Sequence, residues 1–252
     1  MKFSIITPSY NQGKYIKKTI DSVLAQNYRN YEHIIIDGKS TDNTIKILKS
    51  YGKKIRWISE KDKGQSDAIN KGLKIAKGEI FACLCSDDYY LPNTLTKINN
   101  FFLMNKKAKW VTGDYKIVNG KGKDIQNYVV IYKRILRTCP NYQVLSLTNM
   151  IALPSTFWKR EIFENVGYFK TNLHYAMDYD FWLRTIKKYP LFVVNDKLAA
   201  FRIHKLSKGG SRYIEQFKED YLISKNYNKN KFINFLHLMH NTLIVTTYSL
   251  IK

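Results

Sequence analysis

Residues 80–92 read IFACLCSDDYYLP, an apolar run that stops at Ser86 and is followed by two adjacent carboxylates, Asp87 and Asp88. A continuous apolar run is typical of a strand in a parallel sheet, because helices cover both of its faces. Two like charges at the edge of such a sheet raise the pKa of the carboxyl groups unless a cation compensates. The stretch therefore predicts a buried strand that ends at a polar site.

Similar units precede this strand. Earlier strands are predicted at residues 3–7, 33–37 and 55–60, and helices at residues 15–24, 40–51 and 64–78. Ser40 or Thr41 is expected to cap the second helix, and Gly78 to end the third. Pro92 is expected to open a fourth helix that continues to about Asn105. Repeated strand and helix units predict an α/β domain whose mostly parallel sheet carries helices on both faces.

The pattern is less periodic from about Trp110 onwards. Residues 110–124 predict a strand and a small antiparallel hairpin that turns at Asn119 and Gly120, and the sequence up to about Leu153 is irregular. Further on, a helix is predicted at residues 178–189 and strands at residues 191–195 and 198–204. No proline- or serine-rich linker interrupts the chain, so we expect one compact unit with a tail.

Composition narrows the class of protein. The chain has 252 residues, 44% of them hydrophobic, and Lys+Arg 42 against Asp+Glu 20 leave a formal net charge of +22. This excess favours anionic partners such as nucleotides, nucleic acid or lipid phosphates. Cys83, Cys85 and Cys139 lack zinc-type spacing and are expected to be reduced core residues. The N-terminal apolar stretch is too short for a signal peptide, so a cytoplasmic location is expected.

Polar residues follow the predicted strands: Thr7, Pro8 and Ser9, then Asp37, then Glu60, then Ser86, Asp87 and Asp88. The carboxyl ends of parallel strands meet at one edge of the sheet, where open α/β folds bind their ligands. Carboxylate oxygens suit Mg²⁺ or Mn²⁺, and such an ion would hold a phosphate. The alternative is that the two aspartates only begin a turn. The phosphate loops GxGxxG and GxxxxGKS/T are missing, which argues against a dinucleotide or ATP site.

Several segments together resemble the motifs, in family order, of the inverting family 2 glycosyltransferases of bacterial surface polysaccharide synthesis. They read FSIITPSYNQGKYIKKTIDSVLAQNY, HIIIDGKSTDNT, SEKDKGQSDAINKG, CSDDYYLP, PSTFWKRE and HYAMDYDFWLR, and they fall within residues 3–210. The resemblance implies the GT-A fold, a Rossmann-like sheet that binds a nucleoside diphosphate sugar, here expected to be a UDP-sugar. It divides the chain into a GT-A glycosyltransferase domain at residues 1–210 and a helical tail at residues 211–252. Within the domain, residues 1–110 would bind the nucleotide sugar, and residues 111–210 would bind the acceptor and supply the catalytic base.

The resemblance also implies which residues bind the donor. The positions that match are Thr7, Pro8 and Tyr10 for the base and ribose, Asp37 for the base, and Asp67 and Asn70 for the diphosphate and sugar. A role of Asp37 in capping the following helix is the alternative. Ile69 stands where many relatives carry an arginine, and Lys71 is expected to replace that contact.

Ser86, Asp87 and Asp88 stand where the family has its DxD-type metal motif, with Ser86 in place of the first acid. Asp88 is the expected ligand of Mn²⁺ or Mg²⁺, and Asp87 would contact the ribose or the sugar. His204 matches a histidine that meets the metal or the diphosphate, and a purely structural role is its alternative. The lysines and glycines of residues 205–210 could form a lid over the phosphates.

Glycosyl transfer also needs a base for the proton of the acceptor hydroxyl. Asp178 and Asp180 both stand at the start of a predicted helix and face roughly opposite sides, and spacing alone does not separate them. The resemblance implies that Asp178 is the base, whereas Asp180 would stabilise the helix N-terminus. Trp158, Tyr175 and Trp182 could stack on acceptor sugars, or they could belong to the core.

The tail suggests a membrane. No acidic residue follows Asp220, and residues 229–252 mix lysines with apolar residues, which predicts an interfacial helix on an anionic membrane surface. Packing of this helix on the domain is the alternative. Peripheral attachment to the inner face of the cell membrane would suit a glycan acceptor carried on a lipid.

Two other classes of protein are alternatives. A basic nucleic-acid-binding protein would concentrate its lysines in a stripe, whereas here they are spread along the chain and form no known module, so no nucleic-acid partner is expected. A glycoside hydrolase with two carboxylates would share the acids but would need no nucleotide pocket.

Overall fold

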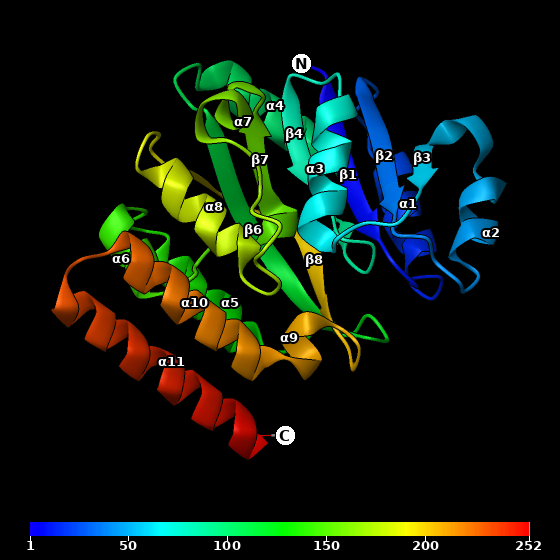
Figure 1. Ribbon diagram of the computed structural model, residues 1–252. Helices are drawn as coiled ribbons and strands as arrows, with labels where there is room; N and C mark the ends of the chain where they lie inside the picture. Colours follow the sequence, from blue (N-terminus) through cyan, green and yellow to red (C-terminus); the bar gives the residue numbers. More distant parts are fainter. Residues whose placement is uncertain (252) are drawn as a thin grey trace.

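The computed structural model describes residues 1–251, which form an eight-stranded sheet with the strand order β3-β2-β1-β4-β7-β6-β8-β5 (Figure 1). The strands are β1 Phe3–Ser9, β2 Tyr31–Asp37, β3 Arg56–Ser59, β4 Ile80–Cys83, β5 Tyr89–Tyr90, β6 Trp110–Asn119, β7 Thr156–Lys159 and β8 Phe192–Ile203. Only β5 and β7 run antiparallel to their neighbours within the described sheet. The prediction of a mostly parallel α/β sheet is confirmed.

Helices cover both faces of this sheet. The α-helices are α1 Ile16–Leu24, α2 Thr44–Ser50, α3 Gln65–Ile75, α4 Thr94–Met104, α5 Asn127–Leu136, α6 Tyr142–Leu147, α7 Glu161–Val166, α8 Met177–Ile186, α9 Lys208–Ser211, α10 Tyr213–Tyr227 and α11 Lys231–Ile251. Phe81 and Cys83 pack in the core on the side of α3, α7 and α8, while Ile80 and Ala82 pack in the core on the side of α1 and α4. The run at 80–83 is continuously apolar because both of its faces are buried.

Three expected helix boundaries are wrong. Helix α2 begins after Ser40 and Thr41, and the Ser40 backbone N–H donates to Asp37 at 2.9 Å. Helix α3 ends three residues before Gly78, whose missing Cβ lets the backbone approach Ser4: a methyl group there would lie 2.6 Å from the Ser4 nitrogen. Helix α4 begins two residues after Pro92, so this proline belongs to the preceding turn. At Gly78 a tertiary contact overrides the local end signal, whereas at Ser40 a local hydrogen bond to Asp37 does so.

The second half is more regular than its sequence suggests. The expected hairpin is present, with Val118 bridged to Asp124 across the turn. Residues between 120 and 153, expected to be irregular, contain α5 and α6. The two strands expected at 191–204 form the single strand β8, because its pairing with β6 shifts register between Gly113 and Tyr115 and so carries the polar middle of β8 across the interruption.

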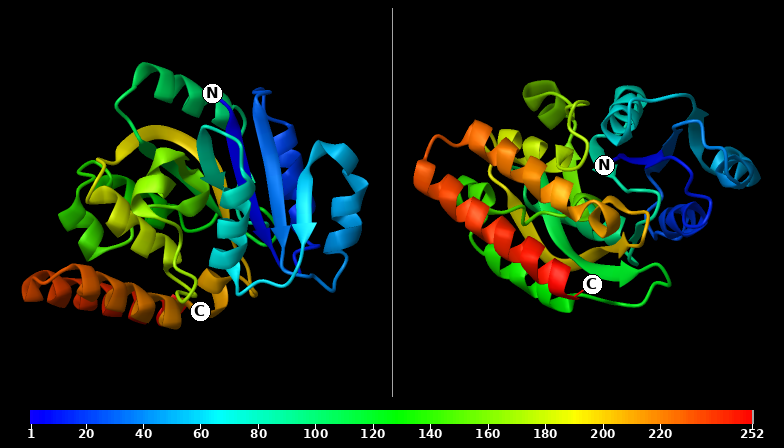
Figure 2. Two further views of the ribbon diagram at one scale, coloured as in Figure 1. Left: turned by 45° about the horizontal axis from the view of Figure 1, so that its top comes forward. Right: turned by 60° about the horizontal axis from the view of Figure 1, so that its bottom comes forward.

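The tail folds back onto the domain (Figure 2). Helices α10 and α11 lie side by side, and the Asn241 side chain on α11 donates to the Phe217 carbonyl on α10 at 3.0 Å. The His237 ring on α11 also meets the Ser146 carbonyl on α6 at 2.8 Å. Across residues 1–251, every helix falls short of the length or the apolar character that crossing a bilayer requires.

The cysteines are free, but they differ in exposure. Cys83 is buried, Cys85 is half-buried and Cys139 is exposed. The expectation of a core position is therefore confirmed for Cys83 and wrong for Cys139, which follows the exposed end of α5. Cys85 lies just beyond β4, at the polar edge of the sheet.

Candidate functional site

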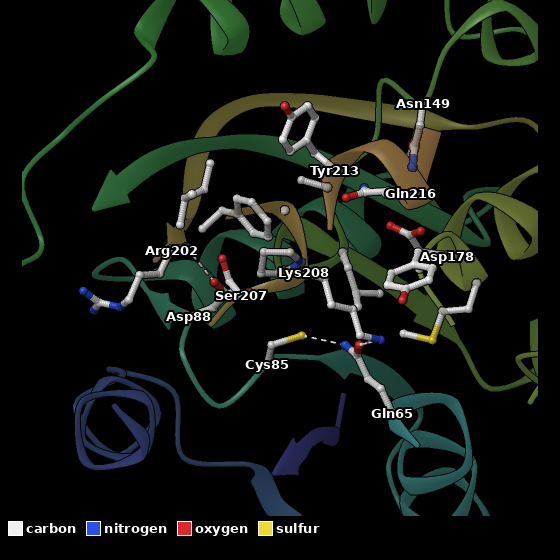
Figure 3. Close-up of a pocket in the computed structure, with 18 of the residues that line it drawn as sticks. Gln65, Cys85, Asp88, Asn149, Asp178, Arg202, Ser207, Lys208, Tyr213 and Gln216 are labelled. Atoms are coloured by element: carbon white, nitrogen blue, oxygen red, sulfur yellow. Dashed lines mark hydrogen bonds between the residues drawn. The ribbon is translucent and has the colours of Figure 1, made fainter. Parts of the chain in front are cut away.

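A cleft of about 900 Å³ opens at the carboxyl ends of β1 and β4 and continues between α8, α5, α10 and α11. Asp87, Asp88 and Asp178 all line it. Figure 3 shows Asp88 and Cys85 towards one side of this cleft and Asp178 with Asn149 towards the other. The fold thus brings the predicted metal motif and the predicted base to one cavity.

Asp88 has the features of a metal ligand. Its side chain is almost fully buried, and one carboxylate oxygen, Oδ1, accepts the Arg202 backbone N–H at 2.8 Å. The other oxygen, Oδ2, is buried and has no hydrogen-bond partner among residues 1–251. Burial, and then the charge of Asp87, raise the pKa of Asp88 well above its usual value. A cation at Oδ2 would remove both penalties.

The donor atoms of Cys85, Asp87 and Asp88 lie within 4.8 Å of one another. Two carboxylates and a sulfur in this space fit a divalent cation. His204 is not in this group of the described residues: its Nε2 lies 3.1 Å from Asp87 Oδ2. The histidine therefore orients Asp87, and a contact of His204 with metal or diphosphate stays a prediction.

The residues expected around the nucleotide base differ in exposure. Pro8 and Tyr10 line the cleft, and Tyr10 is 60% exposed there. Thr7 lies behind them, buried, with its hydroxyl 2.9 Å from Nε2 of His33, whose pKa burial lowers to about 3. Asp37 is fully buried, and its carboxylate accepts hydrogen bonds from Ser40 and from the Ser59 hydroxyl. It ties the loop after β2 to the end of β3.

The residues expected around the diphosphate lie on α3. Asn70 is buried, and its amide exchanges two hydrogen bonds with the Phe169 backbone, at 2.7 and 3.1 Å. Lys71 pairs with Glu60 at 2.8 Å, and the Asp67 carboxylate accepts the Lys63 backbone N–H. None of these three belongs to the cleft lining found within the described chain. Their roles at the donor stay predictions. Ser86 and Asp87, which are also expected at the donor, line the cleft as Pro8 and Tyr10 do.

The structure separates the two aspartates of α8. Asp178 faces the cleft and accepts the Tyr179 backbone N–H at 2.8 Å. Burial raises the pKa of Asp178, although this N–H and the charge of Lys133 oppose the rise. Asp180 points away from the cleft into an ion-pair cluster, where it accepts from Lys170 at 2.7 Å and from Arg184 at 2.8 Å. Asp180 therefore does more than stabilise the helix end: it holds neighbouring segments together.

The aromatic candidates also separate. The rings of Trp158 and Trp182 stack on each other, with centroids 5.4 Å apart, and both side chains are buried in the core. Tyr175 lines the cleft and is the only one of the three that a ligand in this cavity can reach.

Asp220 on α10 was not expected at this site. It lines the cleft, it is 4% exposed, and its Oδ1 has no hydrogen-bond partner in the described part of the chain. Burial, and then the charge of Asp178, raise the pKa of Asp220 well above its usual value. One feature of the sequence marks Asp220: it is the last acidic residue, and the charged residues after it are all lysines.

The sequence predicts Lys208 only as part of a lid. Its ammonium group donates to the Gln65 side chain at 2.9 Å and to the His174 carbonyl, so it joins α9 to α3 and to the loop before α8. Burial lowers the pKa of Lys208. Gln65, which no sequence pattern marked, in turn donates to the Cys85 sulfur at 3.2 Å.

Comparison with known proteins now identifies the family. The model of glycosyl transferase family 2 matches residues 4–167, which is more than half of the chain. The chain belongs to this family. The family match lends no support to a hydrolase or a nucleic-acid-binding protein.

Among curated relatives, the chain is 36% identical over 141 residues to Escherichia coli WfgD, and the match covers 54% of this chain and 55% of WfgD. WfgD is described as a UDP-Glc:alpha-D-GlcNAc-diphosphoundecaprenol beta-1,3-glucosyltransferase. It is 29% identical over 257 residues to the Bacillus subtilis putative teichuronic acid biosynthesis glycosyltransferase TuaG, covering 98% of this chain and 94% of TuaG. An uncharacterized glycosyltransferase of Rickettsia felis is 31% identical and covers 86% of this chain, which spans only 36% of that relative's length.

Solved structures share the fold. The mannosyltransferase PcManGT of Pyrobaculum calidifontis, in complex with GDP-Man and Mn²⁺, superposes with a TM-score of 0.72 at 18% identity, over 96% of this chain and 68% of that one. Residues 1–349 of S. aureus TarS, in complex with UDP-GlcNAc, give a TM-score of 0.67 at 22% identity, over 88% of this chain and 65% of that one. The expected GT-A fold is confirmed.

Proposed function

We propose that this chain transfers a sugar, with inversion, from a nucleoside diphosphate sugar to a hydroxyl group of a glycan acceptor, in a metal-dependent reaction. The observation that carries the proposal is that Asp88, with an unpartnered buried oxygen, and Asp178, with a raised pKa, line one cleft. Membership of glycosyl transferase family 2 supports the reaction class.

Asp88 would hold the cation, Mn²⁺ or Mg²⁺, through Oδ2, with Asp87 beside it. Such a cation supplies electrostatic stabilisation for the negative charge that grows on the departing diphosphate. Arg202 supports this arrangement, because its backbone N–H holds Asp88 and its guanidinium donates to the Asp87 carbonyl at 2.8 Å. Both aspartates are thus fixed to β8 before a donor binds.

Asp178 would act as the general base. The acceptor oxygen forms a bond to the anomeric carbon as the bond from that carbon to the diphosphate breaks, and Asp178 takes the hydroxyl proton. A raised pKa makes a carboxylate a stronger base, and a positioned base typically contributes about 10²- to 10⁴-fold. Attack from the face opposite the diphosphate inverts the anomeric centre, in keeping with the placement of Asp88 and Asp178 on different elements of the cleft.

We assign the donor to residues 1–110 and the acceptor and base to residues 111–210. The nucleotide would lie along Thr7, Pro8 and Tyr10, with Asp37 accepting from the base, and a UDP-sugar is the donor we favour. The diphosphate and sugar would lie towards Asp67, Asn70, Lys71, Ser86 and Asp87, with His204 closing over the phosphates. UDP-GlcNAc and GDP-Man in the related structures support a nucleotide sugar as donor.

The acceptor would be a glycan carried on a lipid, for synthesis of a surface polysaccharide. The cleft runs to α5 and α11, where Tyr132 and Leu243 line it and the Tyr132 hydroxyl meets the His240 ring at 2.7 Å. Both helices expose large apolar side chains on their outer faces, namely Ile131, Ile135, Phe232, Phe235, Leu238 and Met239. Residues 221–252 contain lysines and no acidic residue. We therefore place the tail, residues 211–252, on an anionic membrane surface at the cytoplasmic face.

Release of nucleoside diphosphate tests the reaction. The protein is incubated with a panel of nucleoside diphosphate sugars and Mn²⁺, with thermal stability as a binding readout. We expect one donor to raise the melting temperature and to be turned over, EDTA to abolish turnover, and Asp88→Asn to abolish it as well. Asp196→Asn, an exposed carboxylate on β8, is the matched control and keeps full activity. Full activity in EDTA would contradict the metal, and no binding of any donor would contradict the function.

A further inference from the structure

The third donor of the metal-binding group is unusual for a hard cation. The two carboxylates by themselves would suit Mg²⁺, which prefers oxygen ligands, but the sulfur of Cys85 lies beside them. We propose that Cys85 is a metal ligand together with Asp87 and Asp88, so that the site binds thiophilic divalent cations such as Co²⁺ and Zn²⁺ more tightly than Mg²⁺. This inference rests on the proposed function, because it concerns the cation of the same cleft.

Geometry supports a common ion. The donor atoms of Cys85, Asp87 and Asp88 lie within 4.8 Å of one another. Around one tetrahedral Zn²⁺, with bonds to oxygen and sulfur of about 2.0–2.3 Å, neighbouring donors lie about 3.5 Å apart. The three side chains therefore need to close by about one ångström, which rotation about their side-chain bonds allows.

Asp88 supplies the independent sign of a ligand. Its side chain is 1% exposed, and its Oδ2 is buried without a hydrogen-bond partner among the described residues. A carboxylate oxygen buried in this way is costly unless something positive binds it. Since Asp88 lines the cleft, the missing partner can enter from solvent.

Cys85 is held in place for this role. The Gln65 side-chain amide donates a hydrogen bond to the Cys85 sulfur at 3.2 Å, and the Lys208 ammonium group donates to the side-chain oxygen of Gln65 at 2.9 Å (Figure 3). The hydrogen bond with Cys83 and burial raise the pKa of Cys85 well above its usual value, so the sulfur loses its proton only when a cation takes the proton's place. Cys85 also lines the cleft, whereas Cys83 is buried in the sheet and Cys139 lies on the surface after α5.

Binding would replace a proton by the metal. The Cys85 S–H bond breaks, the proton leaves to solvent, and the sulfur forms a bond to the divalent cation without any change of oxidation state. A thiolate favours Zn²⁺ and Co²⁺ over Mg²⁺, which prefers oxygen ligands. The rest of the coordination shell would be water or donor phosphate oxygens.

Titration of the full chain with CoCl₂ alone tests the proposal, because a thiolate bound to Co²⁺ gives a charge-transfer band in the near ultraviolet. Wild type and Cys139→Ser are expected to show this band at one equivalent of Co²⁺. Cys85→Ser is expected to lack the band, to bind Co²⁺ about tenfold more weakly or worse, and to keep its affinity for Mg²⁺. Circular dichroism checks that each variant is folded.

The results distinguish the role of Cys85 as a ligand from the existence of the metal site itself. A wild-type protein without the band, or a Cys85→Ser variant that keeps the band or the Co²⁺ affinity, overturns the sulfur ligand. Asp88→Asn probes the site itself by titration with Mn²⁺. If that variant binds Mn²⁺ as tightly as wild type, the metal site of the proposed function is wrong; if it loses Mn²⁺ while Cys85→Ser binds Co²⁺ unchanged, only the role of Cys85 is wrong.

Discussion

Asp220 on α10 lies close enough to Asp178 on α8 for the charge of Asp178 to raise the pKa of Asp220. Both carboxyl groups line the cleft, and burial is the largest cause of the raised pKa of each. The charge of Lys133 lowers both pKa values and so favours the ionised form of both carboxyl groups. A second carboxyl group beside the proposed base makes proton uptake by the pair easier.

Replacing the base should remove chemistry and spare binding. Asp178→Asn is expected to lower kcat by about 10²- to 10⁴-fold, because the amide cannot take the acceptor proton. The affinity for the nucleotide sugar should stay within a factor of about two, since Asp178 lies across the cleft from Asp88. Steady-state kinetics and donor titration check this. An unchanged kcat would show that another group is the base.

The neighbour of the base should leave the acidic limb of the kcat/KM profile in place. The pKa of Asp220 is raised further than that of Asp178, and the charge of Asp178 contributes to this rise. Asp220 is therefore neutral while Asp178 ionises, and Asp220→Asn should not move the limb. The limb of wild type is expected above the usual aspartate value of 3.8, in line with the raised pKa of Asp178. A profile measured from pH 4 to 9 decides the matter. A limb that moves to lower pH in the variant would mean that Asp220 is ionised while Asp178 titrates.

The same substitution should change stability with a defined sign. Because burial raises the pKa of Asp220 in the folded chain, the folded state holds a proton that the unfolded state releases above pH 3.8. Stability from this group is therefore lost as the pH rises from 3.8 through the folded pKa. Asp220→Asn should raise the melting temperature at pH 7, by about 2–4 °C per kcal/mol gained, and leave it unchanged near pH 3. A lower melting temperature at pH 7 would contradict this.

Asp180 should behave in the opposite way to Asp178. Asp180→Asn removes the charge that pairs with Lys170 and Arg184 and is expected to cost about 1–3 kcal/mol of unfolding free energy. Since Asp180 points away from the cleft, the activity per folded molecule should remain. Thermal unfolding and kinetics below the transition measure the two effects. Loss of activity without loss of stability would reverse the assignment of the two aspartates.

Membrane binding should depend on the outer face of α11. Phe232 and Phe235 are 67% and 55% exposed, and their joint replacement by serine should weaken flotation with vesicles that contain phosphatidylglycerol by about tenfold or more. The matched control replaces Leu103 and Met104 on α4, which are 56% and 78% exposed on another helix. That control should float like wild type. Equal flotation of both variants would show that α11 does not bind the membrane.

The order of strands and helices in the first half could be read from the sequence, because burial on both faces of β4 requires an unbroken apolar run. Several helix boundaries could not. The sequence predicts a helix end at Gly78, but this glycine is needed where the chain passes close to Ser4, which lies 74 residues away in the sequence. Long-range contacts of this kind leave no local pattern.

Some features of the candidate site could likewise be predicted from the sequence, and others could not. The adjacent carboxylates at 87 and 88 and the pair of aspartates near 180 could be predicted from the sequence, since charge at the end of an apolar run or at the start of a helix is a local property. Which aspartate of α8 faces the cleft, and that Gln65, Lys208 and Asp220 join the site, was decided only by tertiary structure. Spacing along a helix sets the angle between two side chains, but only the packing of that helix determines which of them meets solvent and which is buried against its neighbours.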